Sequence, residues 1–272
     1  MPEGDTIRRI AHRFASTLAG RVIDHFEVND QGEIREFTGR RVDRVEALGK
    51  HLLIHVEGGW SLRVHLGMHG RWHSQRASER RPRSPTALIV AGETAFICTR
   101  AYRAELIRTT QIRTHPLLRR LGPDIMADPP DIDAIVDRTL VPGHAAREIA
   151  DVLIDQQVVA GIGNVYKSEA LFTARIHPRT RVDALERDAL RRLFTEAARL
   201  MNGNLDTARR TSVPLPRRPH PGSDRLWVYG RAGKPCLECG SIVERIVQGD
   251  AARSTWFCPH CQSSSGRSNE GG

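Results

Sequence analysis

Four cysteines near the C-terminus form two close pairs, and this arrangement restricts what the last part of the chain can fold into. Two residues separate Cys236 from Cys239, 18 residues follow, and two residues separate Cys258 from Cys261. Two pairs of thiolates at this spacing can complete a tetrahedral zinc site, so the pattern predicts a zinc ribbon with one structural zinc ion. Two redox disulfides are the alternative, which this spacing favours less.

The residues between the cysteine pairs indicate what such a ribbon would bind. Zinc ribbons bind nucleic acids, bind proteins, or only stabilise a small domain. Arg245 and Arg253 lie between the two pairs, which favours a nucleic acid. The fifth cysteine, Cys98, falls in an apolar segment and is expected to be a buried free thiol.

The charge of the whole chain also indicates a polyanionic partner. The 272 residues carry a formal net charge of +9, and the isoelectric point is near 10.0. No run of apolar residues is long enough to cross a membrane, and the N-terminus does not resemble a signal peptide. The cysteines do not have the pattern of a secreted disulfide framework. We therefore expect a cytosolic protein with two domains and a small appendage.

The N-terminal part of the chain predicts one helix followed by many short strands. An apolar stripe at helical spacing runs from Ile7 to Leu18; Asp5 or Thr6 can cap this helix, and Gly20 ends it. Short apolar or alternating segments between turn residues then predict an antiparallel sandwich or barrel. The expected strands are Arg21–Val28, Val42–Leu48, His51–Val56, Ser61–Leu66, Thr86–Val90 and Thr94–Cys98.

Helices are expected after a polar connection between Thr109 and Pro130, which gives an α+β multidomain fold. The expected helices are Asp131–Arg138, Ala145–Asp155, Val165–Ala174 and Val182–Asn202. Arg209 to Asp224 has the composition of a linker, and Gln75–Pro85 that of a basic loop. We assign residues 1–115 to the β-domain, 131–224 to the helical domain, 229–262 to the ribbon and 263–272 to a disordered tail.

The first residues, Met1-Pro2-Glu3, form a candidate reaction centre. Removal of Met1 would leave Pro2 with a free secondary amine, and α-amino groups titrate near ~8. Such an amine attacks an aldehyde carbon to give an iminium, the electron sink of Schiff-base enzymes, and Glu3 is placed for proton transfer. The alternative is an ordinary chain start with a helix cap.

A glycine-rich segment, Gln156 to Tyr166, joins two of the expected helices. Its glycines would let the backbone approach a phosphate, and Asn164 would cap the following helix, whose N-terminus favours anions. An ordinary tight turn between two helices is the alternative.

Lys50 and Met68 each have two interpretations as well. Lys50 is a solvated lysine or a functional one, and Met68, at a turn, packs normally or acts as a wedge between bases.

Together these segments resemble the formamidopyrimidine-DNA glycosylase and endonuclease VIII family of DNA repair enzymes, in order and over nearly the whole chain. The segments that carry the resemblance are Pro2-Glu3-Gly4, Leu48-Gly49-Lys50, Leu66-Gly67-Met68, Ala160 to Tyr166, and the ribbon with Arg253. The opening looks more like the bacterial endonuclease VIII branch, because a leucine usually follows the glutamate in the guanine-repair branch. The resemblance implies an N-terminal β-sandwich with an N-terminal helix, a helical domain with a helix–two-turn–helix, and a zinc ribbon.

The resemblance also implies roles for single residues. Pro2 would be the Schiff-base nucleophile, Glu3 a proton donor and acceptor, and Lys50 the lysine assigned to proton donation in β-elimination. Met68 would fill the gap left by the flipped nucleotide, Asn164 would hold a phosphate beside the lesion, and Arg253 would assist δ-elimination. Arg120 aligns with a DNA-contacting arginine, and a solvated loop charge is its alternative interpretation.

The implied function is a bifunctional DNA glycosylase and lyase of base excision repair, a bacterial cytoplasmic monomer acting on damaged double-stranded DNA and abasic-site DNA. It would remove an oxidised base and cleave the strand by β,δ-elimination, with no external cofactor. One departure concerns Thr6, where many members have a second glutamate for which Asp5 could substitute. Two rivals are a zinc-ribbon DNA-binding protein without catalysis and a weak relative that only recognises abasic sites. The preferred lesion does not follow from the sequence.

Overall fold

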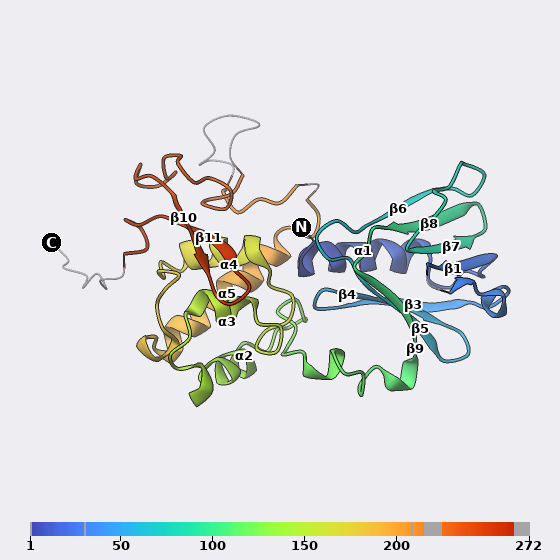
Figure 1. Cartoon of the computed structure of the whole chain (residues 1–272), viewed down its shortest axis with the longest axis horizontal. Coiled ribbons are helices and arrows are strands. Elements are labelled where there is room, and N and C mark those ends of the chain that lie inside the picture. Colours follow the sequence, from blue (N-terminus) through green and yellow to red (C-terminus); the bar gives the residue numbers. More distant parts are fainter. Residues whose placement is uncertain (1, 30, 208, 215–224, 264–272) are drawn as a thin grey trace. The chain divides into compact units, whose positions relative to one another are not determined.

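The computed structural model describes residues 2–29, 31–207, 209–214 and 225–263. The chain divides into two compact units, Met1–Arg120 and Leu121–Gly272 (Figure 1). The predicted tail 263–272 lies outside the described residues except for Ser263, and so does most of the predicted linker Arg209–Asp224. No helix in the described part of the chain is long and apolar enough to span a membrane.

The first unit contains one helix and a sandwich of two antiparallel sheets in its described part. The sheets have the strand orders β2-β1-β7-β8-β6 and β3-β4-β5-β9. The elements are α1 (Gly4–Thr17), β1 (His25–Val28), β2 (Gly32–Glu33), β3 (Val42–Leu48), β4 (His51–Val56), β5 (Trp60–His65), β6 (Arg71–Arg76), β7 (Ala87–Ala91), β8 (Thr94–Thr99) and β9 (Arg103–Arg108), with short 3-10 turns η1 (Arg35–Phe37), η2 (Thr109–Gln111) and η3 (Leu118–Arg120).

A common apolar core joins α1 to both sheets. Phe14 of α1 is fully buried and packs edge-on against Trp72 of β6 and Phe96 of β8, with ring centroids 5.3 and 5.0 Å away. Ile7 of the same helix belongs to this core, as does Leu52 of β4. The apolar stripe predicted from the sequence therefore forms the buried face of α1. The sandwich is the predicted fold class for this part of the chain.

Two details of the predicted N-terminal elements were wrong. The helix is capped by neither Asp5 nor Thr6, because both residues lie inside its first turn. Glu3 is the N-cap, and its backbone carbonyl accepts hydrogen bonds from the N–H groups of Thr6 at 3.0 Å and Ile7 at 3.2 Å. In addition, β6 and β9 were not predicted as strands, and β6 includes the first two residues of the expected loop Gln75–Pro85.

The second unit begins with helices packed around a core of their own. Its described helices are α2 (Ile132–Thr139), α3 (Ile149–Ile154), α4 (Asn164–Thr173) and α5 (Arg187–Asn202), with 3-10 turns η4 (Pro142–His144) and η5 (Val182–Ala184). The expected helix Ala145–Asp155 is shorter than predicted, because α3 starts only after Glu148. The expected helix Val182–Asn202 is divided, because the chain is extended at Glu186 before α5 begins.

The ribbon belongs to the same compact unit as these helices. It is an antiparallel hairpin of β10 (Glu244–Gln248) and β11 (Arg253–Phe257), in which Gln248 pairs with Arg253. A small apolar cluster links it to α4, where the Phe172 ring stacks on Trp227 at 5.4 Å.

A buried carboxylate of α4 holds the chain where it enters the ribbon. Glu169 accepts hydrogen bonds from the backbone N–H groups of Trp227, Val228 and Tyr229 at 2.8, 3.0 and 2.8 Å, and from the hydroxyl of Ser212. Burial raises the pKa of Glu169, and these hydrogen bonds act in the opposite direction. Several donors thus compensate for placing a carboxyl group in a fully buried position.

Candidate active site and nucleic-acid interface

Pro2 and Glu3 lie directly before the first turn of α1. Pro2 is partly exposed, whereas Glu3 and Asp5 are fully buried. The unsatisfied N–H groups and the dipole at a helix N-terminus favour negative charge, which suits carboxylates at this position. The Thr6 hydroxyl donates to the Asp5 carboxylate at 3.2 Å. An accessible Pro2 is therefore followed by a carboxyl group that the protein keeps away from water.

Strand register places Lys50 and Met68 at one end of the four-stranded part of the sandwich. His51 of β4 pairs with His65 of β5, and His65 pairs with Arg103 of β9. The turns that adjoin these residues therefore lie at the same sheet end. Lys50 occupies the β3–β4 turn and Met68 the β5–β6 turn, toward the end of the unit where α1 starts (Figure 1).

Met68 is strongly exposed, and Tyr102 packs beside its turn. Met68 is 63% exposed and Tyr102 is 81% exposed, unusual values for large apolar residues. A Cβ atom on Gly67 would come within 2.8 Å of the Tyr102 Cβ, and the positive φ of Gly67 also favours glycine. Sequence reasoning missed Tyr102, which lies between two strands with no recognisable pattern. This end of the sheet thus presents two exposed apolar side chains.

The histidines behind these turns are neutral at neutral pH. Burial lowers the pKa of His51 to about 3, assisted by the nearby His65 and Arg63. Burial also lowers the pKa of His65, and the positive charges of Lys50 and Arg63 lower it further. The cationic charge at this sheet end therefore comes from lysine and arginine side chains.

The glycine-rich segment forms a tight turn fixed by Gln156. The side chain of Gln156 donates to the carbonyls of Ile154 at 2.8 Å and Ile162 at 3.0 Å, and it accepts from the N–H of Gly161 at 3.1 Å. Gly161 has a φ of 107°. The prediction that Asn164 caps α4 was wrong, because Gly163 is the N-cap and Asn164 is the first residue of the helix. The helix starts one residue earlier than predicted, so the Asn164 side chain does not cap it and bonds to a different part of the chain.

This part of the chain is the ribbon hairpin. The Asn164 side-chain amide donates to the backbone carbonyl of Ser254 at 2.7 Å, and Lys167 Nζ donates to the same carbonyl at 3.2 Å. The N–H of Trp256 donates to the Ser168 hydroxyl at 3.3 Å. One face of α4 therefore holds β11, the strand that begins with Arg253. The Asn164 Oδ1 is buried and has no hydrogen-bond partner within the described residues.

Arg253 is exposed at the first position of β11, beside the hairpin turn. Ala252 and Gly249 in this turn both have positive φ, 48° and 65°. A Cβ atom on Gly249 would lie 2.5 Å from a carboxylate oxygen of Asp151 in α3, so the turn packs closely against that helix. The guanidinium group is thus carried on a hairpin whose turn and second strand, β11, both contact helices. Arg120, in η3, is also exposed.

The four paired cysteines come together as a metal site. Their sulfur atoms all lie within 4.8 Å of one another, and tetrahedral Zn–S bonds of 2.3 Å require sulfur separations of about 3.8 Å. The donor set is therefore suited to zinc, and Cys236, Cys239, Cys258 and Cys261 are its ligands. Cys98 is separate, in β8, where burial raises the pKa of its thiol to about 12.

The predicted site residues divide between the two units. Pro2, Glu3, Lys50, Met68 and Arg120 belong to the first unit, and Asn164, Arg253 and the zinc ligands belong to the second. The β-domain carries the partly exposed Pro2, a buried carboxyl group and exposed apolar side chains. The helical unit carries polar side chains that can bind a phosphate backbone.

Three family models match this chain, one after another along its length. The N-terminal domain of formamidopyrimidine-DNA glycosylase matches residues 1–104, its H2TH domain matches residues 121–213, and a zinc finger found in the same enzyme and in isoleucyl-tRNA synthetase matches residues 233–263. The fold and its sites thus define the architecture of a zinc-finger DNA glycosylase.

Full-length relatives agree with this assignment. The chain is 37% identical to the probable endonuclease 8 2 of Streptomyces coelicolor, over 96% of this chain and 94% of that protein. It is 35% identical to the formamidopyrimidine-DNA glycosylase of Thermus thermophilus, covering 96% and 97%. The Lactococcus lactis enzyme in complex with abasic-site DNA has the same fold, with a TM-score of 0.81, 22% identity and coverage of 96% and 99%. The chain belongs to the formamidopyrimidine-DNA glycosylase and endonuclease 8 family.

Proposed function

We propose that this protein is a bifunctional DNA glycosylase and abasic-site lyase that acts through a Schiff base on Pro2. The observation that carries the proposal is the partly exposed Pro2 immediately before the fully buried Glu3 at the start of α1. Family membership supports it, because the named relatives are DNA glycosylases and endonucleases. Relatives from bacteria support a bacterial cytoplasmic enzyme, and we propose that it acts as a monomer.

The proposed substrate is damaged or abasic duplex DNA. A net charge of +9 and exposed arginines favour binding to the phosphate backbone, with an affinity that falls steeply as salt rises. The Lactococcus lactis enzyme has been crystallised with abasic-site DNA and, as a point mutant, with DNA containing Fapy-dG. Flipping a damaged nucleotide out of the duplex costs least where its stacking or pairing is already weak. The exposed Met68 is suited to fill the space that the nucleotide leaves.

The chemistry needs the amine of Pro2 after removal of Met1. The Pro2 nitrogen attacks C1′ of the sugar and loses its proton, the glycosidic bond breaks, and the base leaves with a proton supplied through Glu3. The C1′–O4′ bond then opens as O4′ takes a proton, which leaves an iminium between the Pro2 nitrogen and C1′. The resulting iminium acidifies the C2′ proton, whose loss expels the 3′ phosphate. A second elimination expels the 5′ phosphate and leaves a one-nucleotide gap. Hydrolysis of the iminium then releases the sugar fragment and regenerates Pro2.

Other predicted residues act on the phosphates and protons of these steps. Lys50 donates a proton in β-elimination, Asn164 holds a phosphate beside the lesion, and Arg253 clamps the phosphate that leaves last. An arginine stays protonated in proteins, so Arg253 acts as a charge and a hydrogen-bond donor and not as a base. Arg120 contacts the DNA backbone. The zinc ion is structural, and it holds the hairpin that presents Arg253.

Borohydride trapping on abasic-site DNA tests the proposal directly. Reduction of an iminium links the protein covalently to the DNA, and peptide mapping should find the adduct on Pro2. A DNA-binding protein without catalysis gives no adduct, and an adduct on Lys50 with Pro2 unmodified would overturn the assignment.

A substitution of the buried carboxyl group tests the role of Glu3. Glu3→Gln keeps the side-chain size but removes the acid, so it should abolish most base removal while DNA binding is retained. Equal activity of the variant on damaged-base DNA would contradict this role. A cleavage panel of oxidised pyrimidines, oxidised guanines, uracil and plain abasic sites would then identify the preferred lesion.

A further inference from the structure

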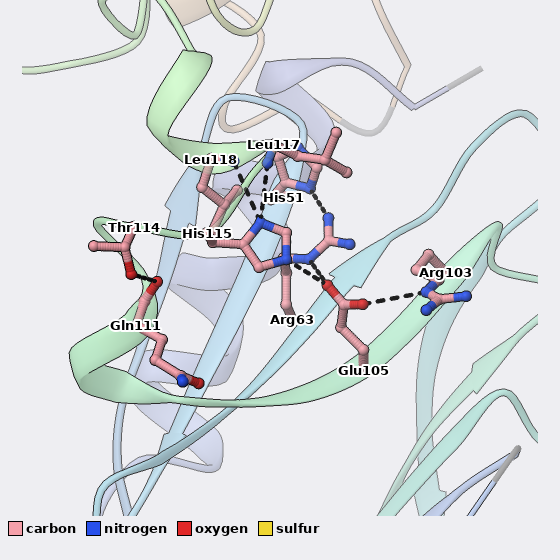
Figure 2. A network of polar contacts seen from close by, with 9 residues as sticks. All are labelled: His51, Arg63, Arg103, Glu105, Gln111, Thr114, His115, Leu117 and Leu118. Carbon is pink, nitrogen blue, oxygen red and sulfur yellow. Dashed lines mark hydrogen bonds and ion pairs between the residues drawn. The ribbon is translucent and has the colours of Figure 1, made fainter.

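A buried arginine on the outer side of the β3-β4-β5-β9 sheet organises a polar network (Figure 2). Arg63 of β5 is only 2% exposed. Its Nε donates to Glu105 Oε1 of β9 at 2.6 Å, and its Nη1 donates to His51 Nδ1 of β4 at 2.9 Å. A buried guanidinium needs a charged partner and further acceptors, and the neighbouring strands supply both. The position of the Glu105 carboxylate is therefore fixed by the sheet.

The same carboxylate oxygen binds a residue outside the sheet. His115 Nε2 is 2.9 Å from Glu105 Oε1, and His115 follows η2 in the segment that leads out of the first unit. The second nitrogen, Nδ1, accepts from the backbone N–H groups of Leu117 at 3.3 Å and Leu118 at 3.4 Å. Because Nδ1 accepts and Nε2 donates, the network assigns the neutral Nε2–H tautomer to His115. One imidazole thus joins the sheet to a backbone turn.

The turn that His115 holds carries two exposed arginines. The N–H of Arg119 donates to the His115 carbonyl at 3.0 Å, and the N–H of Arg120 donates to the Leu117 carbonyl at 3.2 Å. The chain therefore wraps around the imidazole just before the boundary between the two units, which follows Arg120. Leu118 is buried, while Arg119 and Arg120 project into solvent.

We propose that His115 is a positioning residue for DNA binding, which transmits the fixed position of the Arg63–Glu105 pair to the backbone of Leu117–Arg120. This inference rests on the proposed function, because it takes DNA phosphates as the ligands of Arg119 and Arg120. Arginine phosphate contacts depend on geometry, since the guanidinium donates through paired N–H groups. An arginine on an untethered segment would have to be ordered at each binding event, which lowers affinity.

Two substitutions test the hydrogen bonds of the two imidazole nitrogens one at a time. The amide oxygen of His115→Asn can take the place of Nδ1 and accept from the turn N–H groups, but the side chain is too short to reach Glu105. The amide nitrogen of His115→Gln can take the place of Nε2 and donate to Glu105 while the turn loses its acceptor. His115→Ala removes both links, and the exposed neighbour Arg113→Ala is the control for loss of charge without loss of the network.

The decisive measurement is the Kd for a DNA duplex that carries a stable analogue of the abasic sugar. It is compared in a mutant cycle between His115 and the pair Arg119 and Arg120. We expect His115→Ala to raise Kd about fivefold or more in the wild-type background, and less than about twofold when Arg119→Ala and Arg120→Ala are already present. His115→Asn and His115→Gln should each raise Kd by less than His115→Ala. Glu105→Gln, which changes the same contact from the sheet side, should reproduce the dependence on the two arginines.

Three results would overturn the inference. These are an unchanged Kd for His115→Ala, an equal loss in both backgrounds, or an Arg119→Ala/Arg120→Ala protein that binds as well as wild type. Thermal unfolding of each variant identifies any that fail to fold, and Glu105→Gln then provides the same test. Borohydride trapping of the wild-type protein is read separately, so absence of an adduct would refute the Schiff-base proposal without affecting the binding cycle.

Discussion

The side-chain amide of Asn164 donates to the backbone carbonyl of Ser254 at 2.7 Å, which connects the start of α4 to the residue directly after Arg253. The glycine-rich turn and the ribbon hairpin are therefore parts of one arrangement within the second unit. An amide nitrogen carries two N–H groups, so Asn164 can hold Ser254 and still donate to a phosphate. Two residues proposed to bind phosphates are thereby kept in a fixed relation.

Substitution of Asn164 should weaken DNA binding without changing which lesion is preferred. Asn164→Ala removes both the proposed phosphate donor and the contact with Ser254, and a phosphate contact carries no base information. Asn164→Asp should be worse than Asn164→Ala, because a carboxylate would face the Ser254 carbonyl and a DNA phosphate. Ser168→Ala is the matched control, since it removes the acceptor for the Trp256 N–H and the hydroxyl bond to the Asn164 backbone carbonyl but leaves the Asn164 side chain in place. Affinities for several lesions test this, and a lesion-selective loss would place Asn164 in the base pocket instead.

Substitution of Arg253 should change the cleavage product more than the Schiff base. In the proposed mechanism Pro2 and Glu3 remove the base without Arg253, so Arg253→Ala should keep substantial borohydride trapping on abasic DNA while the product shifts from β,δ- toward β-elimination. Arg253→Lys keeps the charge without the guanidinium fork and should be intermediate. Arg245→Ala, an exposed arginine of β10, should leave the products unchanged. Gel analysis of the 3′ ends measures this, and wholly phosphate-terminated ends from Arg253→Ala would exclude the role.

Removal of zinc should impair DNA binding and strand cleavage while the β-domain stays folded. Ligation and ribbon folding are coupled, and the hairpin with Arg253 depends on the ribbon. Metal analysis should find one zinc per chain, retained in Cys98→Ala and lost in Cys258→Ser. A metal-free protein of full activity would contradict the structural role.

The stability of the first unit should depend on pH through His51. Its pKa is about 3 in the folded protein, against an ordinary value of 6.5, so between these values the unfolded chain binds a proton that the folded chain does not. Stability therefore falls as pH falls below 6.5. His51→Asn keeps an acceptor for Arg63 but does not titrate. Between pH 7 and 5 the wild type should lose about 2 kcal/mol more stability than the variant in urea unfolding. Equal losses would contradict a neutral buried His51.

The sequence predicted those strands whose own residues carry an apolar pattern. The bounds of β3 and β4 match the prediction: β4 is buried throughout, and β3 carries Val42, Val45 and Leu48 among its polar residues. In the first unit the missed strands β2, β6 and β9 all lie at sheet edges, and β3 is the edge strand that was predicted. An edge strand packs against fewer neighbours, so polar residues such as those of Arg71–Arg76 are tolerated and the pattern is weak. The apolar periodicity of a segment reflects how its side chains are buried. Because β6 and β9 are only partly buried, their sequences carry little of this signal.

Motifs located the candidate site, but they did not reveal what holds it. The cysteine spacing predicted the zinc ligands, because metal coordination requires a fixed local arrangement of donors. Gln156, Glu169 and His115 act through hydrogen bonds to backbone groups or to residues distant in the chain. Glutamine, glutamate and histidine also occur on solvated surfaces, so the residue type alone does not identify these contacts. The N-caps Glu3 and Gly163 were missed for a related reason, since the preferred cap residues nearby make other contacts: Thr6 donates to Asp5, and Asn164 donates to Ser254.

The buried Glu169 also determines where the metal-dependent part of the chain begins. Because its carboxylate binds three consecutive amides, Trp227 to Tyr229 are tied to α4 by protein groups alone. These amides should therefore exchange their hydrogens with the slow kinetics of the helical core, whether or not the metal is bound. We therefore expect local opening of the ribbon to start beyond Tyr229. The finger can then lose and regain its order reversibly while it stays attached to a rigid base.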